Sequence, residues 1–396
     1  MAGSWISAEE AQARLGVKLQ TLYAYASRGL IANRGDWEDP RRSLYAADDV
    51  QRLALRKLRG RRPSPSDEAS VGRSEPLLAT GLCTLFEGRP YYRGQDAVVL
   101  SDTANLEEAA RLMWDCGAED PFNGLAPHPQ TGTGPDPRAR AFSLLAHSAA
   151  HDPATLGRTD GVLQREAAGL LTDLCDAMCG QVRPGPLHDR LAKAWRVDGY
   201  KADVIRRALV LCIDHPLDAP AFAARTAASA GATLAASVLA GFATMSGPLE
   251  SGKTAQVAGF LAEAKRSSSA RNAAAQRLAQ GLDVPGFGHP LYPYGDPRAE
   301  AMRYSEELTE IARAGEAVTG AAPSLDFALV AMSRTLGLPA EAPWTITALA
   351  RATGWIAHAL EQRASGGRIV PKPRYVGVEP GGEVANEDDL EMVAAE

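Results

Sequence analysis

The sequence is poor in cysteine, with 5 such residues among 396. A small and odd number of cysteines argues against a disulfide framework and is typical of proteins in the reducing cytoplasm. Cys175 and Cys179 lie one helical turn apart, yet no CxxC motif and no nearby histidine pair at zinc-ligand spacing accompanies them. We therefore expect both to act as small hydrophobic side chains and predict no metal site.

Targeting and membrane signals are also missing. The first residues, MAGSWISAEE, contain neither the basic stretch nor the apolar core of a secretory signal. The candidate membrane span, residues 226–249, is diluted by Ala, Gly, Ser and Thr, and small residues of this kind let helices pack closely. The run favours a helix buried in protein over one in lipid, so we expect a cytoplasmic protein that does not enter the membrane.

What is present is enough apolar residue to bury a large core. Hydrophobic residues make up 45% of the chain and charged residues 23%, as in soluble globular proteins. The formal net charge of −6 is uneven, because residues 1–62 hold 12 basic and 7 acidic residues, whereas residues 379–396 hold 7 acidic and no basic ones. Since single cores stop growing at roughly 250–300 residues, we predict two domains and, over residues 379–396, a disordered acidic tail without chemistry.

The N-terminal segment has the pattern of short helices joined by a turn. Ser7 and Glu10 form a capping box that predicts a helix start. Gly16 separates this helix from a second one over residues 19–27. This is the geometry that lets a second helix enter the major groove of DNA. A polar, hairpin-like stretch follows Gly35, and a further helix ends in the basic residues 52–62.

Residues 5–57 resemble the winged helix-turn-helix of the MerR and excisionase type. The stretches that carry the resemblance are EEAQARLGVKLQTLYAYASRGLI and the later YAADDVQRL. The resemblance implies a DNA-binding domain over residues 1–62, with phosphate contacts from residues 52–62. Its recognition helix would present Gln20, Thr21, Tyr23, Tyr25 and Arg28. Such a small domain could instead bind protein, or bind nothing. The Pro-, Ser- and charge-rich residues 63–76 predict a linker.

The remaining body, residues 77–378, is rich in Ala and Leu at helical spacing, for example over residues 106–113, 163–178 and 220–243. Within it, residues 247–254 (GPLESGKT) match the Walker A pattern, and residues 208–214 (ALVLCID) look like a Walker B strand. A P-loop needs a buried strand before the glycine loop. Here the stretch before the glycines has the pattern of a helix. The Walker B candidate also lies before the loop, whereas it usually follows it. Nucleotide binding is therefore the weaker hypothesis.

Several longer motifs in this body resemble those of citrate synthases. Residues 285–299 (PGFGHPLYPYGDPRA) resemble the signature GFGHxxYxxxDPRA. The other matching pieces occur in the family's order: YRGQD at 92–96, DHPLD with FAAR at 214–225, GPLESG at 247–252, PSLDF at 323–327, RATGWIAH at 351–358, and the segment 369–377. The resemblance covers about residues 77–378.

This resemblance implies an all-α, mainly helical citrate synthase fold with a large and a small subdomain, assembled as a homodimer. It implies an acyltransferase that condenses an acyl-CoA with oxaloacetate, without a bound cofactor. Asp326 would be the base that removes the α-proton, and His289 would polarise the ketone. His215, Arg298 and Arg351 would hold oxaloacetate. Outside the resemblance, each histidine could be structural, Arg298 an ordinary ion-pair partner and Asp326 a helix cap.

Two positions depart from the family pattern. Glu250 and Ser251 stand where the family has His and Gly in GPLHGG, and a carboxylate cannot donate the hydrogen bond that such a histidine gives to the thioester oxygen. A protonated Glu250 could still donate, and the nearby Asp326 and a dianionic substrate would favour that form. Lys253 or a bound water could also substitute as the donor, although we expect Lys253 to face solvent. Near the end, aligning Arg374 with the family's motif puts Lys372 where the family has an arginine that reaches across the dimer.

Two functional hypotheses follow from this sequence besides the P-loop. One is an acyltransferase that makes citrate or an alkylcitrate, with a rate or acyl specificity altered by Glu250. The other is a regulator whose synthase-like body binds ligand without turnover while residues 1–62 read DNA. Which acyl-CoA is used, the stereochemistry, the DNA sequence and coupling between domains do not follow from the sequence.

Overall fold

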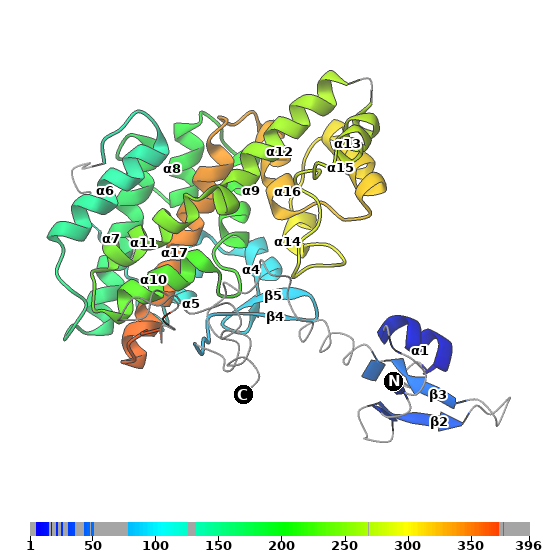
Figure 1. The fold of residues 1–396 in the computed structure, drawn as a ribbon. Helices are drawn as coiled ribbons and strands as arrows, with labels where there is room; N and C mark the ends of the chain where they lie inside the picture. Colours follow the sequence, from blue (N-terminus) through cyan, green and yellow to red (C-terminus); the bar gives the residue numbers. More distant parts are fainter. Residues whose placement is uncertain are drawn as a thin grey trace, which may run out of the picture. The chain divides into compact units, whose positions relative to one another are not determined.

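The computed structural model describes residues 5–15, 17, 21–22, 25–26, 31–35, 43–47, 49–50, 78–125, 132–267, 269–371 and 375. The chain divides into two compact units, residues 1–77 and 78–396, whose secondary structure is drawn in Figure 1. The linker and tail expected from the sequence, residues 63–76 and 379–396, lie outside the described residues. Each unit is described by itself below.

The first unit contains a small antiparallel sheet and a helix. The strands β1 (Trp5–Ser7), β2 (Asn33–Gly35) and β3 (Ser43–Ala46) pair in the order β1-β3-β2. Helix α1 (Ala8–Leu15) begins after Ser7, whose hydroxyl accepts the backbone N–H of Glu10 at 3.1 Å. The Glu10 carboxylate accepts a hydrogen bond from Arg14, so half of the predicted capping box is present. The core includes Leu22 and Tyr45.

The second unit opens with another small sheet, which the all-α prediction missed. Strands β4 (Cys83–Phe86), β5 (Arg89–Tyr92) and β6 (Gln95–Asp96) pair in that order. They escaped prediction because each is very short and their turn needs Gly88 at φ +76° rather than an alternating apolar pattern. Helices α4 (Ala97–Thr103) and α5 (Leu106–Met113) follow, and α5 matches the helical spacing in the sequence.

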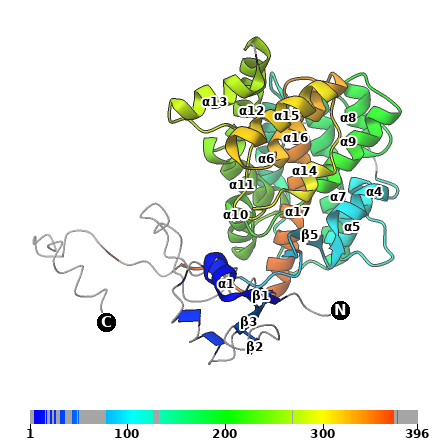
Figure 2. The same cartoon turned by 90° about the vertical axis from the view of Figure 1, so that its right-hand side faces the viewer.

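The large core of this unit surrounds helix α17 (Ala342–Ser365), whose buried residues include Trp355. The helices that contribute to this core along with α4, α5 and α17 include α6 (Pro137–His151), α7 (Asp160–Cys179), α8 (Leu187–Ala194), α9 (Tyr200–Leu211), α10 (Ala219–Ser229) and α11 (Leu234–Met245). Ala328, Leu329, Met332 and Leu336, from a helix described below, also belong to it. Figure 2 shows α17 running through this group of helices. Cys175 is buried in this core and Cys179 packs against it.

A smaller second core lies among the helices that follow α11. Its helices are α12 (Pro248–Arg266), α13 (Ala270–Ala279), α15 (Glu306–Thr319) and α16 (Leu325–Leu336), with the short α14 (Pro297–Glu300) between α13 and α15. Phe260 and Phe327 are both fully buried in it. The unit therefore has a large and a small apolar core, which fits the two subdomains that the sequence resemblance implied.

The single long helix expected before residue 247 is instead two helices. α10 ends at Ser229 and α11 begins at Leu234, because Gly231 adopts φ +79° between them and Thr233 caps α11 through a 2.9 Å bond from Ala236 N. The small residues do serve close packing, since a Cβ on Gly241 would lie 2.6 Å from the Trp355 ring. Among the described residues, no helix is long and apolar enough to cross a membrane.

The P-loop hypothesis is wrong. Gly247 is the N-cap of α12, and residues 248–254 form the first turns of that helix instead of a loop that cradles phosphates. Ala208–Leu211, the start of the supposed Walker B strand, is the end of helix α9. The sequence matches the motif, but helix α11 stands where a P-loop has the buried strand that leads into the phosphate-binding loop.

Candidate active site

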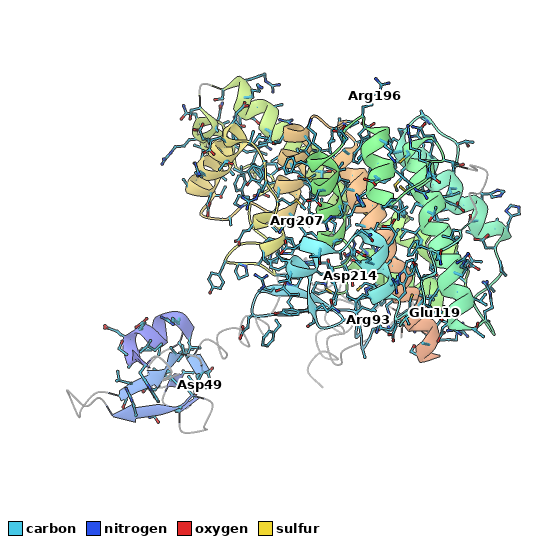
Figure 3. All side chains as sticks on the ribbon, turned by 180° about the vertical axis from the view of Figure 1, so that it is seen from behind. Asp49, Arg93, Glu119, Arg196, Arg207 and Asp214 are labelled. Atoms are coloured by element: carbon cyan, nitrogen blue, oxygen red, sulfur yellow. The ribbon has the colours of Figure 1, made fainter. Side chains whose placement is uncertain are left out.

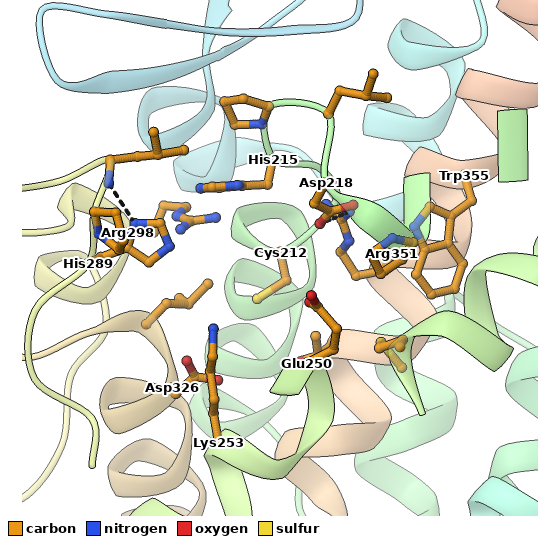
Figure 4. Close-up of a pocket in the computed structure, with 18 residues that line it drawn as sticks. Cys212, His215, Asp218, Glu250, Lys253, His289, Arg298, Asp326, Arg351 and Trp355 are labelled. Carbon is orange, nitrogen blue, oxygen red and sulfur yellow. Dashed lines mark hydrogen bonds and ion pairs between the residues drawn. The ribbon is translucent and has the colours of Figure 1, made fainter. Parts of the chain in front are cut away.

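A cavity of about 450 Å³ lies between the two cores of the second unit. All the residues that the sequence resemblance named and that fall among the described ones line this cavity (Figure 4): His215, Glu250, His289, Arg298, Asp326 and Arg351. They come from loops and helices up to 136 positions apart in the chain. Lys372 and Arg374 lie outside the described residues, as do Gln20, Tyr23 and Arg28 of the first unit. Thr21 is described, and is helical and half-buried.

Two histidines of the cavity wall form an aromatic group with the buried Tyr292. The ring centroids of His215 and His289 are 5.2 Å apart, and Tyr292 lies 5.2 Å from His289 and 5.8 Å from His215. Burial and the nearby charge of Arg298 lower the pKa of both histidines, that of His215 to about 2. Both rings are therefore neutral at neutral pH, and each can donate one hydrogen bond.

The proton of His289 can be assigned to one nitrogen. His289 Nδ1 lies 3.1 Å from the backbone N of Leu291, which can only donate. Nδ1 is therefore the acceptor and Nε2 carries the proton. The Nε2 atom of His215 is buried and has no hydrogen-bond partner among the described residues. Both rings thus have polar atoms available to a bound molecule.

Arg298 is held rigidly beside these rings. Its Nε and one Nη bond the Asp296 carboxylate at 3.0 and 2.8 Å, and its guanidinium lies 5.0 Å from the centroid of Tyr292. Burial would lower the pKa of Arg298, but the Asp296 hydrogen bond outweighs it and raises the pKa, so the charge is permanent. Asp296 is the N-cap of α14, which fixes the pair at the helix start.

Arg351 is already paired with two carboxylates. Its Nη1 bonds Asp214 at 3.2 Å and its Nη2 bonds Asp218 at 2.6 Å. Asp214, visible inside the helical body in Figure 3, also lies 3.1 Å from His358 Nε2. Burial would raise the pKa of Asp214, but His358 and Arg351 outweigh it and lower the pKa. His358 is buried, and its contact with Asp214 places it in the packed interior.

Asp218 is a cavity residue that the sequence reasoning did not single out. It lines the cavity and caps α10 by accepting the backbone N–H of Ala221 at 2.9 Å. A signal was available, because Asp218 stands at the Asn position of the DHxLN motif that the sequence otherwise resembles. It adds a negative charge beside the arginine expected to bind a substrate carboxylate.

Asp326 lies in the first turn of α16 but is not its cap. The N-cap is Ser324, whose hydroxyl accepts from Phe327 N at 3.5 Å. Burial raises the pKa of Asp326, although the charges of Lys253 and Arg298 oppose the shift. Cys212 lines the same cavity, and burial raises its thiol pKa to about 12, so it stays protonated. A carboxyl with a raised pKa facing a cavity is suited to taking up a proton.

Glu250 and Lys253 reach the cavity from the first turns of α12 (Figure 4). The side chains of both are exposed, as expected for Lys253, yet both line the cavity. A second cavity of about 600 Å³ adjoins the first. The two cavities share Lys253, His289, Pro290 and Asp326 in their walls. Among the described residues, no cluster of His, Cys, Asp and Glu could hold a metal ion.

Known proteins with similar sequences include citrate synthases and 2-methylcitrate synthases. Residues 173–374, about half of the chain, match the family described as "Citrate synthase, C-terminal domain". A "Citrate synthase" of Haloferax volcanii is 34% identical over 192 residues, which are 44% of this chain and 50% of that protein. A "2-methylcitrate synthase" of Shewanella oneidensis is 29% identical over 186 residues, 43% of this chain and 50% of that protein. The chain thus spans about half the length of the curated relatives it matches.

Solved structures resemble the fold over a larger share of the chain. The citrate synthase of Thermotoga maritima superimposes with a TM-score of 0.62 at 20% identity, covering 80% of this chain and 97% of that one. A citrate synthase from Thermoplasma acidophilum, described as a ternary complex with carboxymethyl coenzyme A and oxaloacetate, gives a TM-score of 0.61 at 21% identity, covering 77% and 94%. At these identities the likeness is one of fold.

Proposed function

Since this chain belongs to the citrate synthase family, we propose that it condenses an acyl-CoA with oxaloacetate and releases citrate or an alkylcitrate together with free CoA. One observation carries the proposal. The six described side chains that the resemblance names converge on a single cavity, although they come from separate parts of the chain. No metal or redox group is needed for this reaction.

The acceptor end of the cavity has groups that suit a keto acid. Neutral His289 presents Nε2–H, a donor for the ketone oxygen. Arg298 has a third guanidinium nitrogen beyond the two that bind Asp296, and His215 has its unpartnered Nε2. Guanidinium binds carboxylates through paired N–H bonds, so Arg298 and Arg351 would hold the two carboxylates of oxaloacetate.

Asp326 supplies the base. In its ionised form it takes the α-proton of the acyl-CoA, and the electron pair moves onto the thioester oxygen. The resulting enolate carbon attacks the ketone carbon of oxaloacetate, and the ketone oxygen takes a proton from His289 Nε2. Water then hydrolyses the thioester, which releases CoA as its thiol. The second cavity, which shares Asp326 and His289 with the first, would hold the acyl-CoA.

Glu250 weakens this machinery. At the family's histidine position it accepts hydrogen bonds and, when ionised, repels the developing enolate. Loss of one donor to such an oxygen costs about 10²–10³ in rate. The expected consequence is a slower enzyme, or one specialised for an acyl group other than acetyl.

A thiol-release assay tests the proposal. We expect the protein to release CoA thiol from acetyl-CoA or propionyl-CoA only when oxaloacetate is present. Glu250→His, which restores the usual donor, should raise the rate. The proposal fails if neither the natural protein nor Glu250→His releases thiol above the level without oxaloacetate.

We also propose, as a second candidate, a regulator in which the first unit binds DNA. This rests on the first unit having its own sheet, helix and core, separate from the cavity-bearing unit, and on its excess of basic residues. Strand β2 is exposed, and the guanidinium of its Arg34 lies 4.4 Å from the centroid of the Trp5 ring. This candidate predicts salt-sensitive binding to a palindromic site near the protein's own gene. Unchanged mobility of that DNA in low-salt titrations with and without oxaloacetate would rule it out.

A homodimer completes the proposal, because the resemblance puts Lys372 where the family has an arginine that reaches across the dimer. Sedimentation equilibrium should give twice the 41.9 kDa chain mass. A monomer that still releases thiol would show that no partner residue is needed.

A further inference from the structure

Lys253 lies where the two cavities meet. Of the residues that line both, Lys253, His289 and Asp326 have titratable side chains, and Lys253 is the one with an amino group. Glu250 lines the first cavity, whereas Lys253 lines both. The junction is the place where an acyl-CoA in one cavity would meet an acceptor in the other.

The direction of the Lys253 side chain follows from the buried stripe of α12. Val257, Phe260 and Leu261 face the small core and are fully buried. They stand four, seven and eight positions after Lys253, which is the spacing of one face of a helix. Lys253 is therefore the N-terminal continuation of the buried face, and it reaches the cavities where that face leaves the core. Figure 4 shows it extending from α12 into the cavity.

The charge of Lys253 acts on the reacting groups. It opposes the burial that raises the pKa of Asp326, and it helps to lower the pKa values of His215 and His289. Lys253 is the second cause after burial for the pKa of Asp326 and the smallest cause for those of the two histidines, which fits its place in the walls of both cavities.

We propose that Lys253 is a catalytic residue that donates the hydrogen bond to the thioester oxygen, in place of the histidine donor that Glu250 has replaced. The inference rests on the proposed condensation. As Asp326 takes the α-proton, the C–H electron pair forms the enolate double bond and the carbonyl pair moves onto oxygen. The Nζ–H of Lys253 meets this negative charge without transferring its proton. His289 then remains free to protonate the ketone oxygen.

Two variants and a matched control test this role. Lys253→Met keeps the length of the side chain and removes the charge and the donor. Lys265→Ala removes a lysine from the same helix, where it is exposed and paired with Glu307 at 3.7 Å, away from both cavities. We expect Lys253→Met to lower kcat by about 10²–10³-fold, with the KM for oxaloacetate changed less than threefold. Lys265→Ala should keep the natural rate.

The second variant asks whether a restored histidine makes Lys253 dispensable. In Glu250→His with Lys253→Met, we expect kcat to recover at least tenfold relative to Lys253→Met alone. The rate at which the acyl-CoA α-protons exchange for deuterium, followed by NMR, should fall in Lys253→Met and recover in the double variant, as kcat does. Enolisation is the step that the donor assists. Circular dichroism of each variant checks that the fold is kept.

The outcomes separate the two claims. If the natural protein releases thiol and Lys253→Met has the same kcat, or a raised KM with unchanged kcat, the catalytic role of Lys253 is wrong while the condensation stands. If Glu250→His does not rescue Lys253→Met, the two residues do not share one task and the inference fails. If no protein in the series releases thiol or exchanges α-protons, the proposed function fails, and the inference with it.

Discussion

Arg351 is a substrate-binding candidate that already pairs with two carboxylates. Asp214 and Asp218 accept hydrogen bonds from two of its nitrogens. A guanidinium has five N–H donors, so donors remain for a carboxylate of oxaloacetate. Asp214 is fully buried and also bonded to His358, whereas the Asp218 side chain is 28% exposed and lines the cavity. The carboxylate of Asp218 therefore opposes an anionic acceptor at Arg351.

Asp218→Asn should tighten oxaloacetate binding. Asparagine is as good an N-cap as aspartate, so α10 keeps its start, while the competing charge beside Arg351 disappears. We expect the Kd for oxaloacetate to fall about tenfold, or ~1.4 kcal/mol, by isothermal titration calorimetry at low salt. An unchanged or higher Kd would show that Asp218 does not compete with the acceptor.

The pH dependence of the reaction should show the raised pKa of Asp326. The base works ionised, and burial raises its pKa, so kcat/KM should fall as the pH drops through a value above the ordinary carboxyl range. Lys253 lowers that pKa, so Lys253→Met should move the acid limb to higher pH. Lys265→Ala serves as the control and should leave it in place. An acid limb that does not move in Lys253→Met would contradict the electrostatic contact with Asp326.

At the scale of elements, close packing of helices decides stability. α11 and α17 approach so closely that Gly241 faces the Trp355 ring, and Gly354 faces the backbone of Ile213. Motifs that identify the site by letter cannot predict such contacts, because they depend on three-dimensional neighbours. Helical spacing in the sequence predicted α5, and the motifs named six residues that line one cavity. The break between α10 and α11 and the sheet β4-β5-β6 were not predicted, because they depend on a turn glycine and on very short strands.

Two glycine substitutions separate packing from helix propensity. Gly241→Ala places a Cβ 2.6 Å from Trp355, so we expect a loss of about 1–3 kcal/mol in the free energy of unfolding. Gly259→Ala lies inside α12 with no atom within 4 Å of the new Cβ, and should gain about 0.5–1 kcal/mol. Urea denaturation measures both. Equal stability of the two variants would mean that α11 and α17 are not packed this tightly.

The same comparison explains what the sequence could not reveal about the site. Family motifs pointed to Asp326 and Arg298 because their expected chemistry requires a particular residue type at a particular motif position. They did not identify Lys253 as a cavity residue, since the lysine was judged alone and not against the buried stripe of Val257, Phe260 and Leu261. Asp218 was missed because its partner Arg351 is 133 positions away. Pairings of that range exist only in the folded chain.

At the scale of the whole molecule, the cavity joins two cores that pack separately. His215, Arg298 and Arg351 border the large core, whereas Lys253 and Asp326 extend from helices of the small one. A molecule bound between them contacts both parts at once. Binding to the folded state therefore stabilises the cavity-bearing unit as a whole.

Oxaloacetate should therefore raise the thermal stability of the full chain even without acyl-CoA. At about 100 times its Kd, a ligand adds ~2.7 kcal/mol to the folded state. We expect calorimetry to show a higher Tm for the unfolding of the second unit, and no shift in Arg298→Ala, which loses the carboxylate partner. An unshifted Tm in the natural protein at millimolar oxaloacetate would argue against both the enzyme and the ligand-sensing regulator.

The small sheet at the start of the second unit sets a limit on how the chain can be shortened. The hydroxyl of Tyr92, at the end of β5, bonds the backbone of Leu211 at 3.1 Å and that of Asp214 at 3.3 Å. This phenol holds the turn that carries His215. Any shortened form of the protein that begins after residue 92 would lose the anchor of its own cavity wall. Residues 78–96 therefore belong with the cavity-bearing helices, although they contribute no side chain to the cavity.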